Sequence, residues 1–148
     1  MAETSWLKLI HPAFEYEFNS YRDSALDAQS RVGESWVTTP AGKKFLALNY
    51  QIRDRIPNDP SNPEFRLGNA SGKENKHWFR GKFLQQYRIC FRYSTRSQII
   101  AYAWVNNSES LRKYRSNSDA YLVFKKMLES GRIPNDWAEL VAESKKLS

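Results

Sequence analysis

Two stretches in the first half of the chain carry apolar side chains at helical spacing. From residue 12 to about residue 31, apolar positions recur every three or four residues, which predicts an amphipathic helix ended by Gly33. Thr39 and Pro40 predict the start of a second helix, because threonine is a favourable cap and proline a favourable first helical residue; it should stop at Pro57. A short strand over residues 5–10 precedes both. The apolar stripes are Phe14, Phe18, Tyr21, Ala25 and Ala28 in the first helix and Phe45, Leu48, Ile52 and Ile56 in the second.

Between residues 78 and 105 the pattern changes to the alternation that is typical of β-strands. Three strands are expected, at residues 78–84, 87–93 and 98–105, and the short turns between them predict an antiparallel meander. After a polar connection, Ser118 is the expected cap of a helix to about residue 128, and a last short helix begins at Asp136. This order predicts a single α+β domain over residues 1–148, with an antiparallel sheet packed against two N-terminal helices and with C-terminal helices.

Positive charge is concentrated in the second half of the chain. Residues 1–62 hold 7 Lys and Arg against 8 Asp and Glu, whereas residues 63–148 hold 16 against 8. Between Arg66 and Arg115 there are 11 basic residues and only two acidic ones. Such a surface attracts polyanions, because each phosphate that it neutralises releases condensed counterions. Nucleic acid is therefore the expected partner, and a basic face that serves solubility is the alternative.

The chain lacks the sequence features of several other classes. No apolar stretch is long enough to span a bilayer, and the first residues do not have the pattern of a secretion signal, so we expect a cytoplasmic protein that does not enter a membrane. Cys90 is the single cysteine and is expected to be an inert packing residue. Neither a histidine and carboxylate cluster with metal-ligand spacing nor a phosphate-binding glycine loop is present, so we expect no metal and no cofactor.

Basic side chains of two neighbouring strands are predicted to share one face of the sheet. Alternate residues of a strand face opposite ways, so Arg88 and Arg92 lie on one side while the apolar residues between them pack on the helices. In the preceding strand, Arg80 and Lys82 fall on the same side as these two arginines. The expected result is a solvent-facing, cationic surface. Solvated decoration of an open sheet face is the alternative.

A cationic face of this kind suits the cleavage of RNA. The 2′-OH of RNA is an internal nucleophile, so a protein needs no metal if it deprotonates this hydroxyl, stabilises the phosphorane and protonates the leaving oxygen. Arginine and lysine side chains suit the second task. Tyr114 is a candidate acid or base, because it follows Arg112 and Lys113 and cationic neighbours lower the pKa of a phenol. Packing at a junction between a strand and a helix is the alternative for Tyr114.

Histidine and tryptophan side chains are further candidates, and basic residues outside the sheet are predicted to bind RNA. His11 and His77 suggest the acid and base of a two-histidine ribonuclease, but His11 precedes Pro12 and is better explained as a helix cap. Trp78 and Trp104 are candidates for stacking on bases, with packing in the core as the alternative. The residues predicted to bind RNA lie in the loop over residues 58–76 and in the connection after the third strand: Arg66, Lys73, Lys76, Arg112, Lys113 and Arg115.

Six motifs follow one another along the chain. They are NPEFR at residues 62–66, GKENKHW at 72–78, YRICFRY at 87–93, LRKY at 111–114, SDAYLVFKKML at 118–128 and GRIPNDW at 131–137. Together with the order strand, helix, helix, three-stranded meander and helix, they resemble the YhaV-type toxins, a branch of the RelE/ParE superfamily of bacterial toxins. The resemblance covers nearly the whole chain from His11 onward and is strongest after Asn62.

The resemblance implies a RelE-like fold and an endoribonuclease toxin of a type II toxin–antitoxin system. Such a toxin cuts mRNA and thereby inhibits translation and growth. The implied partner is a PrlF-type antitoxin with an AbrB-like DNA-binding domain, which would connect the toxin to operator DNA. The ribosome is a further implied partner, because it helps to shape the active site of some members of the superfamily.

The resemblance also implies roles for particular residues. Arg88 matches the arginine near the scissile phosphate, and Tyr114 matches the tyrosine that acts as acid or base. Arg80 and Lys82 fall near the paired basic residues of the preceding strand. The chain departs from the RelE pattern at residues 106–108, where Asn-Asn-Ser stands in place of a Gly-Lys-Arg sequence. Arg112 or Arg92 is the candidate substitute for the arginine missing there.

Two other functions remain as alternatives to RNA cleavage. A ParE-like toxin on the same fold would inhibit gyrase and would need no pairing of Arg88 with Tyr114. A noncatalytic basic RNA-binding module would need positive charge but no particular residue. Cleavage of RNA is the leading prediction because it uses both the charge and the motifs.

Overall fold

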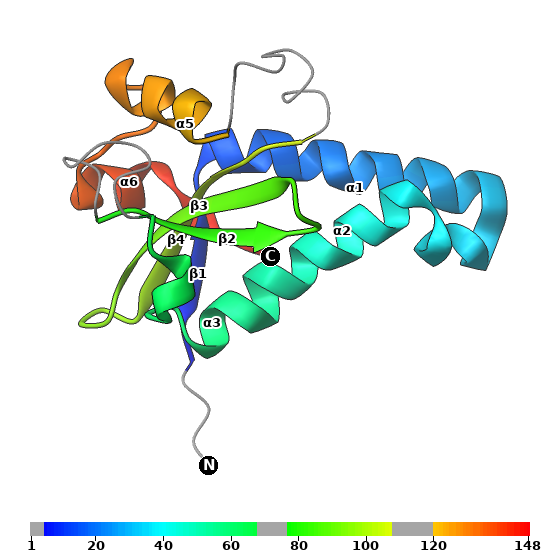
Figure 1. The fold of residues 1–148 in the computed structure, drawn as a ribbon, viewed down its shortest axis with the longest axis horizontal. Helices are drawn as coiled ribbons and strands as arrows, with labels where there is room; N and C mark the ends of the chain where they lie inside the picture. The colour runs from blue at the N-terminus through cyan, green and yellow to red at the C-terminus, as the bar shows by residue number, and fades with distance from the viewer. Residues whose placement is uncertain (1–4, 68–76, 108–119) are drawn as a thin grey trace.

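The computed structural model of the chain describes residues 5–67, 77–107 and 120–148, in which helices lie on both faces of a five-stranded sheet (Figure 1). The elements are β1 Leu7–Ile10, α1 Pro12–Val32, a 3-10 helix Gly33–Thr38, α2 Pro40–Tyr50, a π-helical turn Gln51–Arg55, α3 Ile56–Asn58, a 3-10 helix Pro63–Phe65, β2 Phe79–Phe83, β3 Tyr87–Ser94, β4 Ile99–Val105, α5 Ala120–Glu129, α6 Trp137–Glu143 and β5 Lys145–Lys146.

The two N-terminal helices and the three-stranded meander are confirmed. α1 ends before Gly33, which has a φ of 64°, and α2 begins after Thr39, whose side chain caps it. Asp136 caps α6 in the same way. β2, β3 and β4 are antiparallel neighbours, as their short turns predict. The predicted cap Ser118 lies outside the described residues.

The sheet is mixed, which corrects the expectation of an antiparallel one. Its strand order is β2-β3-β4-β1-β5; β1 runs parallel to β4, and the two-residue strand β5 is antiparallel to β1. Leu7 pairs with Ile99, and Ile10 pairs with Tyr102. Alternation of side chains predicts which face a strand buries, but it does not determine which neighbour the strand pairs with. The direction of β1 was therefore not accessible from its own sequence pattern.

The predicted apolar stripes of α1 and α2 form the core with one face of the sheet. Almost every residue of the two stripes is buried; the exception is Phe45, which is partly buried and packs against the same cluster. The residues of β3 that alternate with its arginines, among them Ile89 and Phe91, belong to this cluster. The face of β3 that carries Arg88 and Arg92 is consequently turned away from α1 and α2.

The opposite face is not open, which corrects the expectation of a solvent-facing surface. α5 and α6 cover its centre, where Cys90 and Trp104 are 0% and 1% exposed (Figure 1). The reason lies in β4, which is apolar at all of its positions and is therefore suited to burial on both faces. Of the basic residues predicted on this face, Lys82 is exposed, and Arg80, Arg88 and Arg92 are partly buried.

A bulge in β4 places two large aromatic side chains on opposite faces of the sheet. Cys90 pairs with Trp104, and Phe91 pairs with Tyr102, so Ala103 has no partner of its own in β3. Tyr102 therefore packs in the cluster of α1 and α2, and Trp104 packs in the cluster of α5 and α6. Trp104, like Trp78, is a core residue, which confirms the alternative to base stacking.

The π-helical turn between α2 and α3 leaves one carbonyl without a backbone donor. The N–H of Ile56 donates to the carbonyl of Gln51, five residues earlier. The corresponding donor for the carbonyl of Ile52 would be Pro57, which has no N–H. Instead, the hydroxyl of Tyr102 donates to this carbonyl at 2.7 Å inside the core. Burial raises the pKa of Tyr102 well above its ordinary value, so the hydroxyl remains a donor.

Tyr102→Phe should lower the free energy of unfolding by about 1–3 kcal/mol, because the buried carbonyl of Ile52 would lose its partner. Denaturant unfolding followed by circular dichroism measures the loss. Tyr16→Phe is the matched control, since Tyr16 is 70% exposed, and should leave the stability unchanged. Wild-type stability of the Tyr102 variant would contradict this explanation of the π-helical turn.

Candidate active site on the basic sheet face

Four basic residues of β2 and β3 share one face of the sheet. In the register of these strands, Arg80 is paired with Cys90 and Lys82 with Arg88. Directly paired residues of antiparallel strands point their side chains to the same face. Arg92 follows Cys90 by two positions and faces the same way. The structure thus brings together on one face the basic residues that alternation predicts there, beside the helix α5.

The guanidinium of Arg88 is held by three oxygen atoms. Its Nη1 donates to the carbonyls of Gln85 at 2.6 Å and of Tyr87 at 2.9 Å, and its Nε donates to the hydroxyl of Tyr121 at 3.0 Å. None of these acceptors is a carboxylate, so they orient the guanidinium without neutralising its charge. Its Nη2 makes no hydrogen bond with the residues that the structure describes. Arg88 can therefore present to an anion a fixed positive charge and an Nη2 to which no described residue is bonded.

Tyr121 lies in the first turn of α5, between two of these arginines. Its hydroxyl accepts the hydrogen bond from Arg88, and the guanidinium of Arg80 lies over its ring at 5.7 Å from the centroid. Arg80 also donates from Nη1 to the carbonyl of Glu64 at 3.1 Å, while its buried Nε has no partner among the described residues. Tyr121 is not among the site residues predicted from the sequence. The one indication was its place at the start of a helix next to a basic strand face.

Arg92 has different neighbours from Arg88. Its guanidinium lies between the rings of Trp78 and Trp137, at 5.6 and 5.5 Å from their centroids, and its Nη1 donates to the carbonyl of Asn135 at 2.7 Å. Burial lowers the pKa of Arg92, and the nearby Asp136 opposes this shift. Arg92 lies four positions after Arg88 along β3, a distance of roughly 13 Å. The face therefore holds two separate groups of basic side chains.

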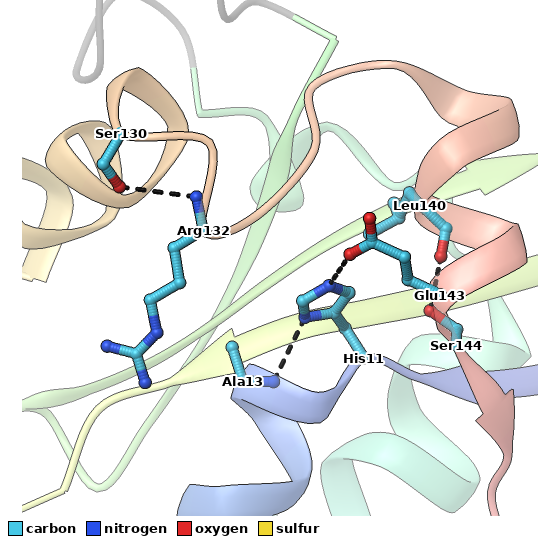
Figure 2. Close-up of polar contacts among 7 residues, drawn as sticks. All are labelled: His11, Ala13, Ser130, Arg132, Leu140, Glu143 and Ser144. Carbon is cyan, nitrogen blue, oxygen red and sulfur yellow. Dashed lines mark hydrogen bonds and ion pairs between the residues drawn. The ribbon is translucent and has the colours of Figure 1, made fainter.

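His11 is a buried structural residue that connects the two ends of the chain. It is 3% exposed; its Nδ1 accepts from the N–H of Ala13, and its Nε2 is bonded to a carboxylate oxygen of Glu143 at 2.8 Å (Figure 2). The first contact confirms the prediction that His11 caps α1. Because both ring nitrogens are engaged away from Arg88, His11 is not placed to exchange a proton with RNA.

His77 belongs to a separate contact at the start of β2. Its Nε2 is bonded to Oδ1 of Asn135 at 2.7 Å, and the same oxygen accepts from the indole N–H of Trp78 at 2.7 Å. Asn135 thus holds the connection between α5 and α6 against the residues that precede β2. His11 and His77 have different partners and do not form the acid and base pair of a two-histidine ribonuclease.

Cys90 is inert, as expected. Burial raises the pKa of its thiol far above the ordinary value, and the opposing effects of Arg80 and Arg88 are smaller. A thiol that stays protonated is a poor nucleophile. Within residues 5–67, 77–107 and 120–148, no group of three or more His, Cys, Asp and Glu side chains is arranged to hold a metal ion.

The remaining predicted residues are mostly not placed by the structure. Arg66 is exposed and forms an isolated β-bridge with Phe79. Among the helices of the described ranges, none is long and apolar enough to cross a membrane. The predicted site residues that lie outside the described residues are Lys73, Lys76, Arg112, Lys113, Tyr114 and Arg115.

The structure is that of an α+β protein with four basic residues of β2 and β3 on one face of its sheet. Residues 8–145 match the YhaV toxin family, which is described as a toxin with endonuclease activity, of a toxin–antitoxin system. The Ribonuclease toxin YhaV of Escherichia coli strain K12 is 34% identical over 141 residues, which cover 94% of this chain and 92% of that protein. Toxin YhaV of Escherichia coli O157:H7 matches to the same extent. No solved structure was found to match the chain.

The chain belongs to the YhaV toxin family. It is an endonuclease toxin of a toxin–antitoxin system, and an antitoxin is therefore its partner.

His11→Ala should lower the free energy of unfolding by about 1–2 kcal/mol through the loss of the cap on α1. His11→Asn should cost less, because asparagine is a good cap, although it cannot keep the contact with Glu143. Thermal and denaturant unfolding of both variants measure the difference. Equal losses in the two variants would show that capping is not what His11 contributes.

Proposed function

We propose that the chain is a metal-independent endoribonuclease that cuts mRNA in the cytoplasm through attack by the 2′-OH of the RNA. The arrangement around Arg88 carries the proposal: a charged guanidinium is held by neutral oxygen atoms, and its Nη2 makes no hydrogen bond within the described residues. Arg80 and Lys82 add positive charge beside it. The name of the relative, a ribonuclease toxin, supports RNA as the substrate class.

In the proposed reaction, the 2′ oxygen attacks the neighbouring phosphorus while the bond from phosphorus to the 5′ oxygen breaks. The products are a 2′,3′-cyclic phosphate and a free 5′-hydroxyl. A base removes the 2′ proton, and an acid gives a proton to the leaving 5′ oxygen. Negative charge grows on the phosphorane oxygens between these events. A cation that is already oriented lowers this barrier, because no reorganisation is needed when the charge develops.

The basic residues take different parts in this proposal. Arg88 contacts the reacting phosphate, with Arg80 and Lys82 beside it, and Tyr114 is the candidate acid or base. Arg92 was predicted as part of the catalytic group; since its guanidinium lies between two indole rings, we assign to it the anchoring of the connection between α5 and α6. The RNA backbone is bound more widely, by Arg66, Lys73, Lys76, Arg112, Lys113 and Arg115.

A RelE-like fold and a PrlF-type antitoxin complete the proposal. The order of β1, α1, α2, the meander and α5 supports the fold. An AbrB-like domain in the antitoxin would connect the pair to operator DNA.

Within the described part of the chain, Tyr121 is the titratable side chain that is bonded to Arg88. No histidine or carboxylate of the described residues is bonded to Arg88. Because a histidine or carboxylate is the usual general acid or base, this composition favours a reaction in which the ribosome helps to complete the active site.

Arg88→Ala should lower the rate of mRNA cleavage about 100- to 1000-fold, the loss typical for removal of one group that stabilises developing charge. Transcript lengths in a cell-free translation reaction measure this rate, since both RNA and ribosomes are present. Growth arrest on expression should be relieved. Arg96→Ala is the matched control: it removes the same charge from the exposed turn between β3 and β4 and should cleave normally.

The alternatives give different results in the same experiment. Wild-type cleavage by a folded Arg88→Ala protein would refute the proposed site. DNA breakage with intact transcripts would favour a gyrase-inhibiting toxin of the ParE type. An RNA complex without cleavage, weakened equally by Arg88→Ala and Arg96→Ala, would favour a noncatalytic binding module. Tyr114→Phe in this assay tests the acid or base.

Cleavage should not depend on a metal ion bound to the toxin. Purified protein is incubated with naked RNA in magnesium buffer and in EDTA, and in parallel with the same RNA on translating ribosomes in magnesium buffer. If the toxin needs no ribosome, both naked RNA and ribosome-bound RNA should be cut. If it needs the ribosome, only the ribosome-bound RNA should be cut. Cleavage of naked RNA in magnesium that EDTA abolishes would contradict the metal-independent mechanism. Steep weakening of RNA binding with salt is expected in each case.

A further inference from the structure

Asn106 directly follows β4 and is a polar residue that is only 1% exposed. A buried amide is costly unless its donor and its acceptor are both bonded. Its Oδ1 accepts from the backbone N–H of Arg88 at 2.7 Å, and its Nδ2 donates to the carbonyl of Gln86 at 3.2 Å. Its own carbonyl accepts from the buried hydroxyl of Tyr21 at 2.6 Å. Asn106 therefore joins the end of β4 to α1 and to the start of β3.

The side chain of Asn106 fixes the turn between β2 and β3. In this turn Leu84 and Gln85 have positive φ values of 46° and 66°, a region that residues other than glycine rarely adopt. A backbone of this kind persists only where surrounding contacts determine it. The amide of Asn106 holds residue 86, which directly follows the strained pair, and residue 88.

The same turn supplies two of the oxygen atoms that hold the guanidinium of Arg88. Nη1 of Arg88 donates to the carbonyls of Gln85 and Tyr87. Asn106 is bonded to Gln86, which follows Gln85, and to Arg88, which follows Tyr87. A shift of the turn would therefore move both acceptors and change the direction in which Nη2 points.

From this connection we infer that Asn106 is a positioning residue for the cleavage reaction, which acts by fixing the turn that orients Arg88. The inference rests on the proposed function of Arg88. Asparagine suits the role because one side chain supplies both a donor and an acceptor. Aspartate would keep the acceptor for the N–H of Arg88 but would place an oxygen against the carbonyl of Gln86. Alanine would remove both contacts.

The test measures cleavage in the cell-free translation reaction, at a temperature at which circular dichroism shows each variant folded. Asn106→Ala should lower kcat about 10- to 100-fold, the loss expected when a reacting group is misplaced by about 1 Å. KM for the mRNA should change less than kcat. Tyr102→Phe is the matched control, because it removes a buried bond to a carbonyl in another part of the core, and it should retain its kcat.

A double-mutant cycle separates positioning from a general loss of structure. Arg88→Lys retains the charge but has a single nitrogen in place of the guanidinium that the turn orients. In this background, Asn106→Ala should lower kcat by at most about 2-fold further, because residues that act as one unit are not additive. Asn106→Asp enters the same cycle and decides the matter if Asn106→Ala does not fold.

The outcomes distinguish this inference from the proposed function. Equal fold-losses from the Asn106 substitution in both backgrounds would overturn the inference, and so would a wild-type kcat in a folded Asn106 variant. Neither result concerns the role of Arg88. Wild-type cleavage by Arg88→Ala would instead remove the proposed function itself.

Discussion

The charge of Arg88 is oriented by oxygen atoms that carry no formal charge. Two peptide carbonyls and a phenol hydroxyl accept its hydrogen bonds, so the guanidinium is fixed while its positive charge remains available. A carboxylate in the same place would orient the group equally well but would cancel much of its attraction for a phosphate. The cost of ordering a long side chain is met during folding and does not recur at each reaction. In the proposed reaction, the stabilisation of developing charge depends on that arrangement.

The fold brings Tyr121 from a distant part of the chain to Arg88, whose other two acceptors are carbonyls of the adjoining turn. Because β4 is apolar on both faces, the sheet needs helices on both sides, and α5 covers the second face with Tyr121 in its first turn. On the first face, α1 reaches the end of β4 through the hydroxyl of Tyr21. Asn106 lies between these layers and fixes the turn that contributes the two carbonyls. Core packing and the orientation of Arg88 are thus parts of one structure.

Local patterns in the sequence predicted the helices and strands and which side chains lie on the same face of the sheet, because both depend on periodicity alone. The stripes of α1 and α2, the cap at His11 and the common face of Arg80 and Arg88 follow from spacings within single elements. The parallel pairing of β1 and the covering of the basic face by α5 and α6 depend on contacts between distant elements. The role of Tyr121 was missed for the same reason. In the sequence, Asn106 stands out only as a departure from the RelE pattern, since a buried amide and an exposed one look alike in a sequence.

The rigidity of the Arg88 side chain in the protein without RNA is the most direct test. NMR relaxation of the arginine Nε–H groups compares Arg88 with Arg96, which lies in an exposed turn. If Arg88 is held in advance of substrate, its order parameter should be close to that of rigid backbone, about 0.85, while that of Arg96 should fall below about 0.6. An Arg88 side chain as mobile as that of Arg96 would contradict the claim that the fold orients this charge before RNA arrives.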